Sequence, residues 1–220
     1  MSLKVLIACE ESQRSCFAFR DLGFEAYSCD IQEPSGGGIQ WHILGDVLPI
    51  LNGNCKFKTM DGVEHEIVGK WDLIIAHPPC THLAVSGARW FKEGVKPIEW
   101  QNEAAAFFMK FINADCDHIA VENPVCVMST RYRKPDQIIN PYQFGHMEQK
   151  KTCLWLKGLP KLVDTNNVYE EMMKLPEKER AKVWWMGSNH SKERSKTYEG
   201  IARAFAKQWG EYLLQEENIK

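Results

Sequence analysis

The sequence of 220 residues lacks several patterns that would set its class at once. Its eight cysteines include no Cys-x-x-Cys pair, and no leading segment combines a basic start with an apolar core and a cleavage site. We therefore expect a reduced, cytoplasmic protein that needs no disulfides. No apolar run approaches the roughly 20 residues of a membrane span, so we expect no membrane role.

The chain also lacks an excess of positive charge. Its 27 Lys and Arg residues against 29 Asp and Glu residues give a net charge of −2. This balance excludes binding to nucleic acid through a general basic field, so any such contact must be local. Short charge runs usually form an ordinary solvated face. Three basic stretches are candidates for a local contact: 131–134, 150–151 and 192–196.

What the chain does contain is an alternation of short apolar runs with amphipathic segments. We expect strands over 4–8, 24–29, 71–76, 119–122 and 152–156, and helices over 14–22, 100–112 and 198–214. A further apolar piece lies at 45–48, and Asp61-Gly62 marks a turn in a hairpin-like insertion near 52–70. The alternation predicts one α/β domain over 1–220, with a mostly parallel sheet and helices on both faces.

Two predicted strands lead into side chains that can carry chemistry. The run 71–76 stops at His77-Pro78-Pro79-Cys80, and the run from 119 ends in Glu122-Asn123-Pro124. In open α/β sheets the carboxyl ends of the strands face one crevice, so we expect both segments there. The prolines fix the backbone before Cys80, and a carboxylate such as Glu122 is costly to bury without a partner. This layout suits a nucleophile and its proton-handling partner, although a structural cysteine and a buried ion pair are alternatives.

The histidines beside Cys80 invite a zinc interpretation. His77, Cys80 and His82 form a compact cluster. Zinc usually takes four ligands from separated pairs, and the two prolines favour a splayed loop over a chelating turn. We therefore expect no metal at this segment.

The first two predicted strands carry features of a cofactor site. Asp30 ends the second strand, where α/β nucleotide-binding folds place an acid that accepts ribose hydroxyls. The loop 9–13 lacks a Gly-x-Gly-x-x-Gly pattern, and its Glu10 and Glu11 would repel a pyrophosphate. A dinucleotide is therefore disfavoured, whereas S-adenosylmethionine, with its sulfonium and ammonium groups, is compatible. Alternatively, the two acids only place negative charge at a helix N-terminus.

Taken in order, these segments resemble the cytosine-5 DNA methyltransferases, most closely the short methyltransferase-like proteins of phages and prophages. The stretch 6–24 is similar to the first cofactor motif of that family. Pro78-Pro79-Cys80 is similar to its catalytic segment, and 83–87 to the mobile loop that follows. Glu122-Asn123 matches the Glu-Asn motif. Gln149-Lys150-Lys151 looks like a weakened Gln-Arg-Arg motif, and 198–202 resembles the final segment that returns to the cofactor.

The resemblance implies a Rossmann-like, S-adenosylmethionine-dependent methyltransferase fold and assigns roles. Cys80 would add to carbon 6 of a cytosine flipped out of DNA, and Glu122 would protonate ring nitrogen 3. The implied cofactor contacts are Ala8, Cys9, Glu10, Ser12, Asp30, Ile31, Asp46, Pro78 and Tyr198. The implied substrate contacts are Pro79, Asn123, Lys151 and Arg194.

Three departures from the family pattern keep alternatives open. The first loop lacks the family's glycines, lysines followed by Cys153 replace the paired arginines, and the target-recognition region shrinks to about 161–182. One alternative is therefore that the substrate is a pyrimidine nucleotide or an RNA. Another is that a partner protein or an oligomer supplies the recognition surface. A degenerate, non-catalytic module that binds DNA or cofactor is a further alternative.

Four tryptophans are candidates for base stacking, although such residues more often belong to a core or an interface. They are Trp155, Trp184, Trp185 and Trp209.

Overall fold

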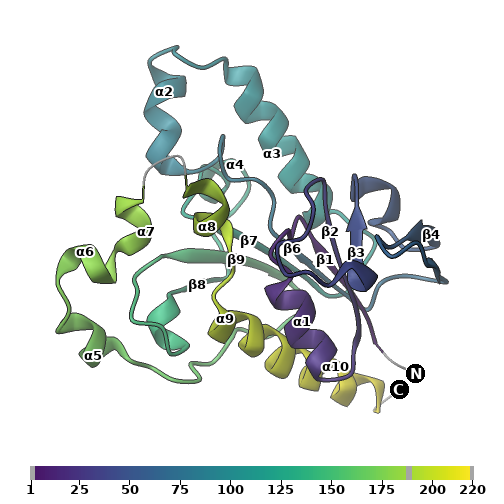
Figure 1. Cartoon of the computed structure of the whole chain (residues 1–220). Coiled ribbons are helices and arrows are strands. Elements are labelled where there is room, and N and C mark those ends of the chain that lie inside the picture. The colour runs from purple at the N-terminus through teal and green to yellow at the C-terminus, as the bar shows by residue number, and fades with distance from the viewer. Residues whose placement is uncertain (1–2, 187–189, 219–220) are drawn as a thin grey trace.

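A computed structural model describes residues 3–186 and 190–218 and is built around one seven-stranded sheet (Figure 1). The strands lie in the order β3-β2-β1-β6-β7-β9-β8. Their bounds are β1 Lys4–Ala8, β2 Glu25–Asp30, β3 His42–Leu44, β6 Leu73–Ala76, β7 Ile119–Pro124, β8 Gln137–Ile139 and β9 Thr152–Lys157.

The direction of the strands confirms a mostly parallel, Rossmann-like sheet. β3, β2, β1, β6 and β7 pair in parallel, whereas β9 runs antiparallel to β7 and β8. The chain builds outward from β1 through β2 and β3, then returns to the other side of β1 with β6 and β7. Ligands of open α/β sheets bind outside the carboxyl ends of the strands at such a switch point. Here the switch point lies between the ends of β1 and β6.

Helices cover both faces of the sheet, as the alternation predicted (Figure 1). Alternate residues of a strand face opposite sides, so Val5 and Ile7 of β1 pack with Phe19 and Trp209, while Leu6 and Ala8 belong to the other core. The helices are α1 Arg14–Asp21, α2 Ala88–Lys92, α3 Ile98–Ile112, α4 Met128–Arg131, α5 Tyr169–Met173, α6 Glu177–Arg180, α7 Lys182–Trp185, α8 Ser191–Ser195, α9 Glu199–Ala204 and α10 Gly210–Glu217.

The insertion near 52–70 is a hairpin, as expected. β4 Cys55–Lys58 and β5 Glu64–Ile67 pair antiparallel, and Gly62 takes a φ of +89° in the turn between them. Phe57 of the hairpin stacks on Trp71, which precedes β6, at 6.1 Å between ring centroids. The hairpin thereby covers the face of the sheet that also carries α3.

Some element bounds differ from the sequence prediction. The apolar piece 45–48 is not a strand: β3 ends before it, and Gly45, at a φ of +153°, leads into a 3-10 turn over Leu48–Ile50. β7 continues past Glu122 to Pro124. The edge strand β8 is only three residues long and was not predicted. The last helical segment contains a π-helical turn, Phe205–Trp209, between α9 and α10.

None of the helices in the described ranges is long and apolar enough to cross a membrane.

Candidate active site

The segments that follow β6 and β7 lie side by side at the switch-point edge of the sheet. Ala76 pairs with Val121, so His77 and Glu122 come next on neighbouring parallel strands. His77 Nδ1 lies 2.9 Å from Glu122 Oε2, and the two side chains are only 10% and 17% exposed. The folding of two strands thus builds a nearly buried histidine–carboxylate pair three residues before Cys80.

Charge and burial act in opposite directions on this pair. Burial alone would lower the pKa of His77, but the hydrogen bond and charge of Glu122, with Glu10 as a second carboxylate, raise it. Burial alone would raise the pKa of Glu122, but the hydrogen bond and charge of His77, with Lys150, lower it. Each group of the pair therefore stabilises the charged form of the other.

Cys80 sits at the open side of this pair. As a whole residue it is exposed, yet the surrounding protein desolvates its thiol. This desolvation and the negative charge of Glu122 raise its pKa, while Lys150 and Arg194 act in the opposite direction. A thiol that acts as a nucleophile needs a lowered pKa. The chain by itself instead holds Cys80 as a thiol at neutral pH.

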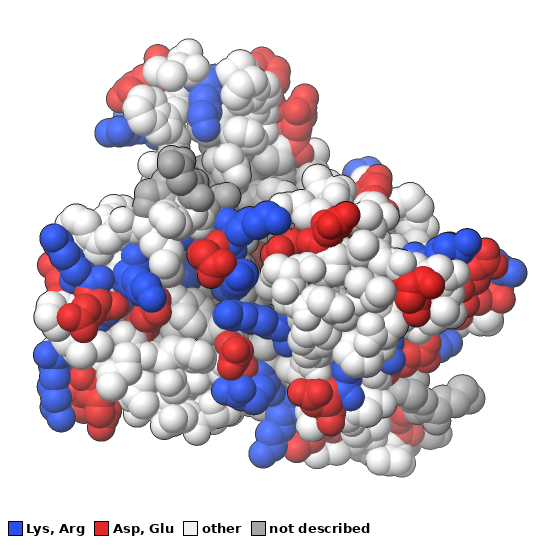
Figure 2. Space-filling model, viewed as in Figure 1, with Lys and Arg blue, Asp and Glu red and all other residues white. Residues whose placement is uncertain are grey.

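A basic group lies next to the thiol. Lys150 Nζ donates a 2.8 Å hydrogen bond to the Arg194 carbonyl oxygen and lies 5.7 Å from the Tyr198 ring centroid. Figure 2 shows Lys and Arg side chains gathered at the middle of this face, with Asp and Glu side chains among them. Lys151 is exposed, and its charge acts on Cys153. Lys150 is thus the lysine that acts on Cys80, His77 and Glu122.

The predicted cofactor residues of the first loop occupy the turn from β1 to α1. Ala8 is buried at the end of β1, and Cys9 adopts a left-handed φ of 59°. Glu10 accepts hydrogen bonds from the Ser15 amide at 2.6 Å and the Cys16 amide at 3.1 Å. It therefore caps the first turn of α1, as the helix-terminus alternative held. Ser12 is also buried in this loop.

Two acids converge near Cys9 from the other side of the switch point. Burial and then the charges of Asp30, Cys29 and Asp46 raise the pKa of Cys9 far above its usual value. Asp30 Oδ1 accepts a 2.9 Å hydrogen bond from the Gln32 amide, and Asp46 Oδ1 accepts one from the Leu48 amide at 3.0 Å. Asp30 ends β2 and is half-buried, and Asp46 follows β3 and is exposed, so both carboxylates remain accessible.

The Asp30 and Asp46 carboxylates are hydrogen-bond acceptors that fit an adenosine. The ribose hydroxyls and the adenine amino group are donors, which match the two carboxylates, and Ile31 is 78% exposed beside Asp30 as an apolar contact for a ring. The residues present thus fit S-adenosylmethionine.

Pro78 and Tyr198, also predicted to contact the cofactor, lie near the cysteine segment. Pro78 is buried, and Pro79 after it is exposed. Tyr198 stands at the N-terminus of α9, where its hydroxyl donates a 2.5 Å hydrogen bond to Glu148 Oε2. Burial and this bond raise the pKa of Tyr198 well above its usual value. Its hydroxyl is therefore a protonated donor.

From the sequence, His77 had no role beyond the zinc interpretation. Lys150 belonged to the basic stretch 150–151 and to the weakened Gln-Arg-Arg motif, but the implied substrate contact was Lys151. The only sequence signal for His77 was its place directly after a buried strand. His82 of the same sequence segment packs against two aromatic rings instead. Its ring centroid lies 5.9 Å from that of Phe91 and 5.5 Å from that of Trp100. Among residues 3–186 and 190–218, no group of three or more His, Cys, Asp and Glu side chains is arranged to hold a metal ion.

The four tryptophans divide into two classes. Trp155 and Trp209 are fully buried and belong to the cores, whereas Trp184 and Trp185 of α7 are 75% and 55% exposed. Only the latter two present surfaces to a base.

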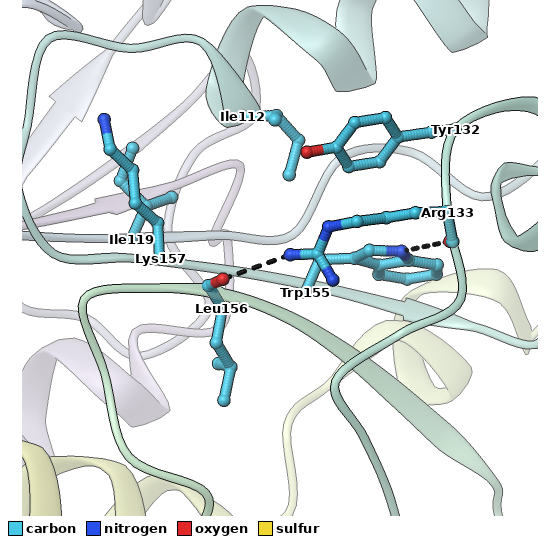
Figure 3. A pocket seen from close by; sticks show the side chains of 7 residues that line it. All are labelled: Ile112, Ile119, Tyr132, Arg133, Trp155, Leu156 and Lys157. Atoms are coloured by element: carbon cyan, nitrogen blue, oxygen red, sulfur yellow. Dashed lines mark hydrogen bonds between the residues drawn. The ribbon is translucent and has the colours of Figure 1, made fainter.

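A cavity of about 190 Å³ lies away from Cys80, beside β9 (Figure 3). In it, Arg133 reaches toward the Leu156 carbonyl oxygen, to which it donates a 3.1 Å hydrogen bond, and it pairs with Asp136 at 2.7 Å. Trp155 Nε1 donates to the Arg133 carbonyl oxygen at 2.9 Å. These bonds fasten the 132–136 loop to the sheet. None of the residues predicted to be catalytic or to contact cofactor or substrate lines this cavity, and of the stacking candidates only Trp155 does.

Comparison with known proteins adds one weak structural likeness. No protein-family model and no curated protein matches the chain. Among solved structures the chain is similar to a methyltransferase of Entamoeba histolytica, EhMeth, with 11% sequence identity and a TM-score of 0.41. The match covers 76% of this chain and 58% of that protein. A likeness of this size identifies no activity.

Proposed function

We propose that this chain is an S-adenosylmethionine-dependent DNA cytosine-5 methyltransferase. The observation that supports it most is the meeting of Cys80 with Glu122 and Asn123 at the ends of two adjacent parallel strands. Asn123 Nδ2 donates a 2.7 Å hydrogen bond to the Pro78 carbonyl oxygen, which ties the Pro-Pro-Cys segment to β7. A thiol and a carboxyl group held by rigid strand ends suit attack on a ring and protonation of that ring.

The cofactor would be held at the switch point. Asp30 and Asp46 would accept hydrogen bonds from its adenosine, and Ile31 would contact the adenine ring. When bound, S-adenosylmethionine supplies an electrophilic methyl group. Glu10 already caps α1 with both carboxylate oxygens, and burial raises the pKa of its carboxyl group, so its contribution there would be to hold the loop after β1 in place.

The chemistry on the base follows from the two strand ends. The Cys80 thiol would lose its proton to solvent, and the thiolate would add to carbon 6 of a flipped cytosine while Glu122 delivers a proton to ring nitrogen 3, which makes carbon 5 nucleophilic. After carbon 5 is methylated, a base takes its proton and Cys80 leaves. Asn123 would hold the Pro78-Pro79 backbone against the base throughout.

Contacts to DNA would come from the cationic group beside the thiol. Lys150 and Arg194 lie close enough to Cys80 to oppose the rise in its pKa, and Lys151 is exposed beside them. Lysine acts as a point charge toward phosphate, so these contacts would position DNA without reading its sequence. The region 161–182 contains only the short helices α5 and α6 and the first residue of α7, so we propose that a partner protein or second copy supplies sequence readout.

The test is mass spectrometry of the protein incubated with S-adenosylmethionine and an oligonucleotide carrying 5-fluorocytosine, whose fluorine prevents the final elimination. We expect a covalent adduct on Cys80. Cys80→Ala should give no adduct while retaining cofactor binding by calorimetry, and Cys55→Ala in the hairpin should react like the unchanged protein.

Other outcomes point to other functions. Cofactor binding without an adduct, together with methylation of a deoxycytidine nucleotide or an RNA, would replace DNA as the substrate. Neither adduct nor cofactor binding would leave a non-catalytic binding module. A fully active Cys80→Ala protein would overturn the mechanism.

A further inference from the structure

His77 stands directly behind the carboxyl group that would meet the base. Three charged groups face its ring: Glu122 from β7, Glu10 from the loop after β1 and Lys150 from the segment before β9. Nδ1 is bonded to Glu122, and Nε2 is buried with no hydrogen-bond partner in the described part of the chain. Two carboxylates therefore face one imidazole, and only one of them is bonded to it.

The state of Glu122 raises a question about its proton. The His77 hydrogen bond and charge hold the pKa of this carboxyl below its usual value, so at neutral pH Glu122 is an acceptor. Protonation of ring nitrogen 3 requires a donor. His77 Nδ1 lies 2.9 Å from Glu122 Oε2, so a proton on this nitrogen is within hydrogen-bond reach of the carboxyl group.

We propose that His77 is a positioning residue for Glu122, holding the proton that the Glu122 carboxyl group passes to the cytosine. This inference rests on the proposed function. Cys80 first gives its thiol proton to solvent. When the resulting thiolate adds its electron pair to carbon 6, the Nδ1–H bond of His77 breaks, and the Glu122 carboxyl group takes that proton and gives one to ring nitrogen 3. His77 ends neutral and Glu122 ionised.

Reversal of the same path returns the proton when Cys80 leaves, so the couple is restored without an outside acid. The terminal torsion of a glutamate is broad and two-fold, so either carboxyl oxygen is able to turn from His77 to the base. Glu122 stabilises the charged imidazole between turnovers, whereas Lys150 opposes it. Burial raises the pKa of Glu10 and the charge of His77 lowers it, so Glu10 adds to this stabilisation only while it is ionised.

The experiment measures the rate of adduct formation with the 5-fluorocytosine oligonucleotide across pH, in the unchanged protein and in His77→Asn. Without His77, the donor is a buried carboxyl group alone. We expect the alkaline limb of the profile to move at least about one unit toward lower pH, a loss of about tenfold at a fixed pH on that limb.

The chain offers a matched control. His118 forms the second His–Glu pair of the described residues, with Nε2 3.0 Å from Glu216, just before β7 at the opposite edge of the sheet. His118→Asn should keep the unchanged profile. If the unchanged protein forms the adduct and His77→Asn has the same pH profile as the unchanged protein, the inference fails and the proposed function stands. If the unchanged protein forms no adduct, the proposed function itself fails.

A second measurement does not depend on activity or on the folding of His77→Asn. Titration of the histidine ring signals by NMR should show His77 gaining its proton above the usual range in the unchanged protein. Glu122→Gln should lower that titration point and leave the His118 signal in place. A His77 signal that titrates normally, or that ignores Glu122→Gln, would overturn the inference.

Discussion

The side-chain amide of Asn123 donates a 2.7 Å hydrogen bond to the carbonyl oxygen of Pro78. Asn123 is only 2% exposed, and a proline segment has no amide hydrogens with which to join a sheet ladder. The bond thus replaces the missing ladder between the segment after β6 and the end of β7. It fixes Cys80 relative to Glu122 without passing through either residue.

Asn123→Ala should loosen this connection. Loss of a buried hydrogen bond that leaves a carbonyl unpaired costs about 1–3 kcal/mol, which denaturant unfolding would measure. The rate of adduct formation should fall as well, while cofactor affinity stays the same. Asn102→Ala removes an exposed partner of Arg131 and should change stability by less than about 0.5 kcal/mol. Equal effects of the two variants would contradict this role for Asn123.

The pKa of Cys80 should respond in opposite directions to its two neighbours. Glu122 raises it and Lys150 lowers it, so Glu122→Gln should lower the pKa and Lys150→Gln should raise it. The pH dependence of iodoacetamide alkylation reports the thiolate, with Cys80→Ser identifying the signal. Alkylation near neutral pH should accelerate in the first variant and slow in the second. Shifts of the same sign would show that these charges do not act on the thiol.

The His77–Glu122 pair should stabilise the fold within a defined pH window. The raised pKa of His77 contributes stability that is complete below its unfolded value of 6.5 and is lost as pH rises through the folded pKa. The lowered pKa of Glu122 contributes stability that is complete above 4.5 and is lost as pH falls through the folded pKa. The window of full effect is therefore pH 4.5 to 6.5.

Unfolding measurements on the unchanged protein and on the double variant His77→Asn, Glu122→Gln would reveal that window as the pH range of greatest difference. The single variant His77→Asn leaves a buried carboxylate unpaired and should cost about 3 kcal/mol near neutral pH. A difference that does not vary with pH would contradict a charged pair.

The strands and their order along the chain were predictable because their apolar runs are continuous and end in turn residues. The run 73–76 ends at two prolines, and Gly23, at a φ of +85°, ends the first helix where expected. The Cys80 and Glu122 segments were expected to meet because the carboxyl ends of parallel strands face the same crevice. These expectations needed only local pattern and sheet chirality.

The partners of individual side chains were not predictable in the same way. His77 and Glu122 are 45 residues apart, and their bond depends on the register of β6 against β7, which no local pattern sets. The sequence left two interpretations of Glu10, a cofactor contact and a charge at the helix N-terminus. The hydrogen bonds from the α1 amides to Glu10 show that it caps the helix, and a local sequence pattern does not set those bonds. Edge strand β8 is three residues long and is held by β9, so its sequence alone carries little signal.

Gly200 should be irreplaceable at the start of α9. A methyl group there would stand 1.9 Å from the Phe144 carbonyl oxygen, so the backbone would have to shift. The shift would also strain the 2.9 Å bond from the Gly200 amide to His146 Nε2. Gly200→Ala should lower stability by about 1–3 kcal/mol. Gly87→Ala, whose methyl would meet nothing closer than 3.9 Å, is the control, and a comparable loss there would remove the explanation.

Asp30→Asn should weaken binding of S-adenosylmethionine. A hydrogen bond from a ligand to a charged group contributes about 1.5–3 kcal/mol, so calorimetry should show a loss of roughly 10-fold to 100-fold in affinity. Asp21→Asn, at the exposed end of α1, should leave affinity unchanged. The same Asp30 variant should lower the raised pKa of Cys9, because Asp30 contributes to that rise. A lowered pKa of Cys9 with unchanged affinity would show that the carboxylate faces the site but does not hold the ribose.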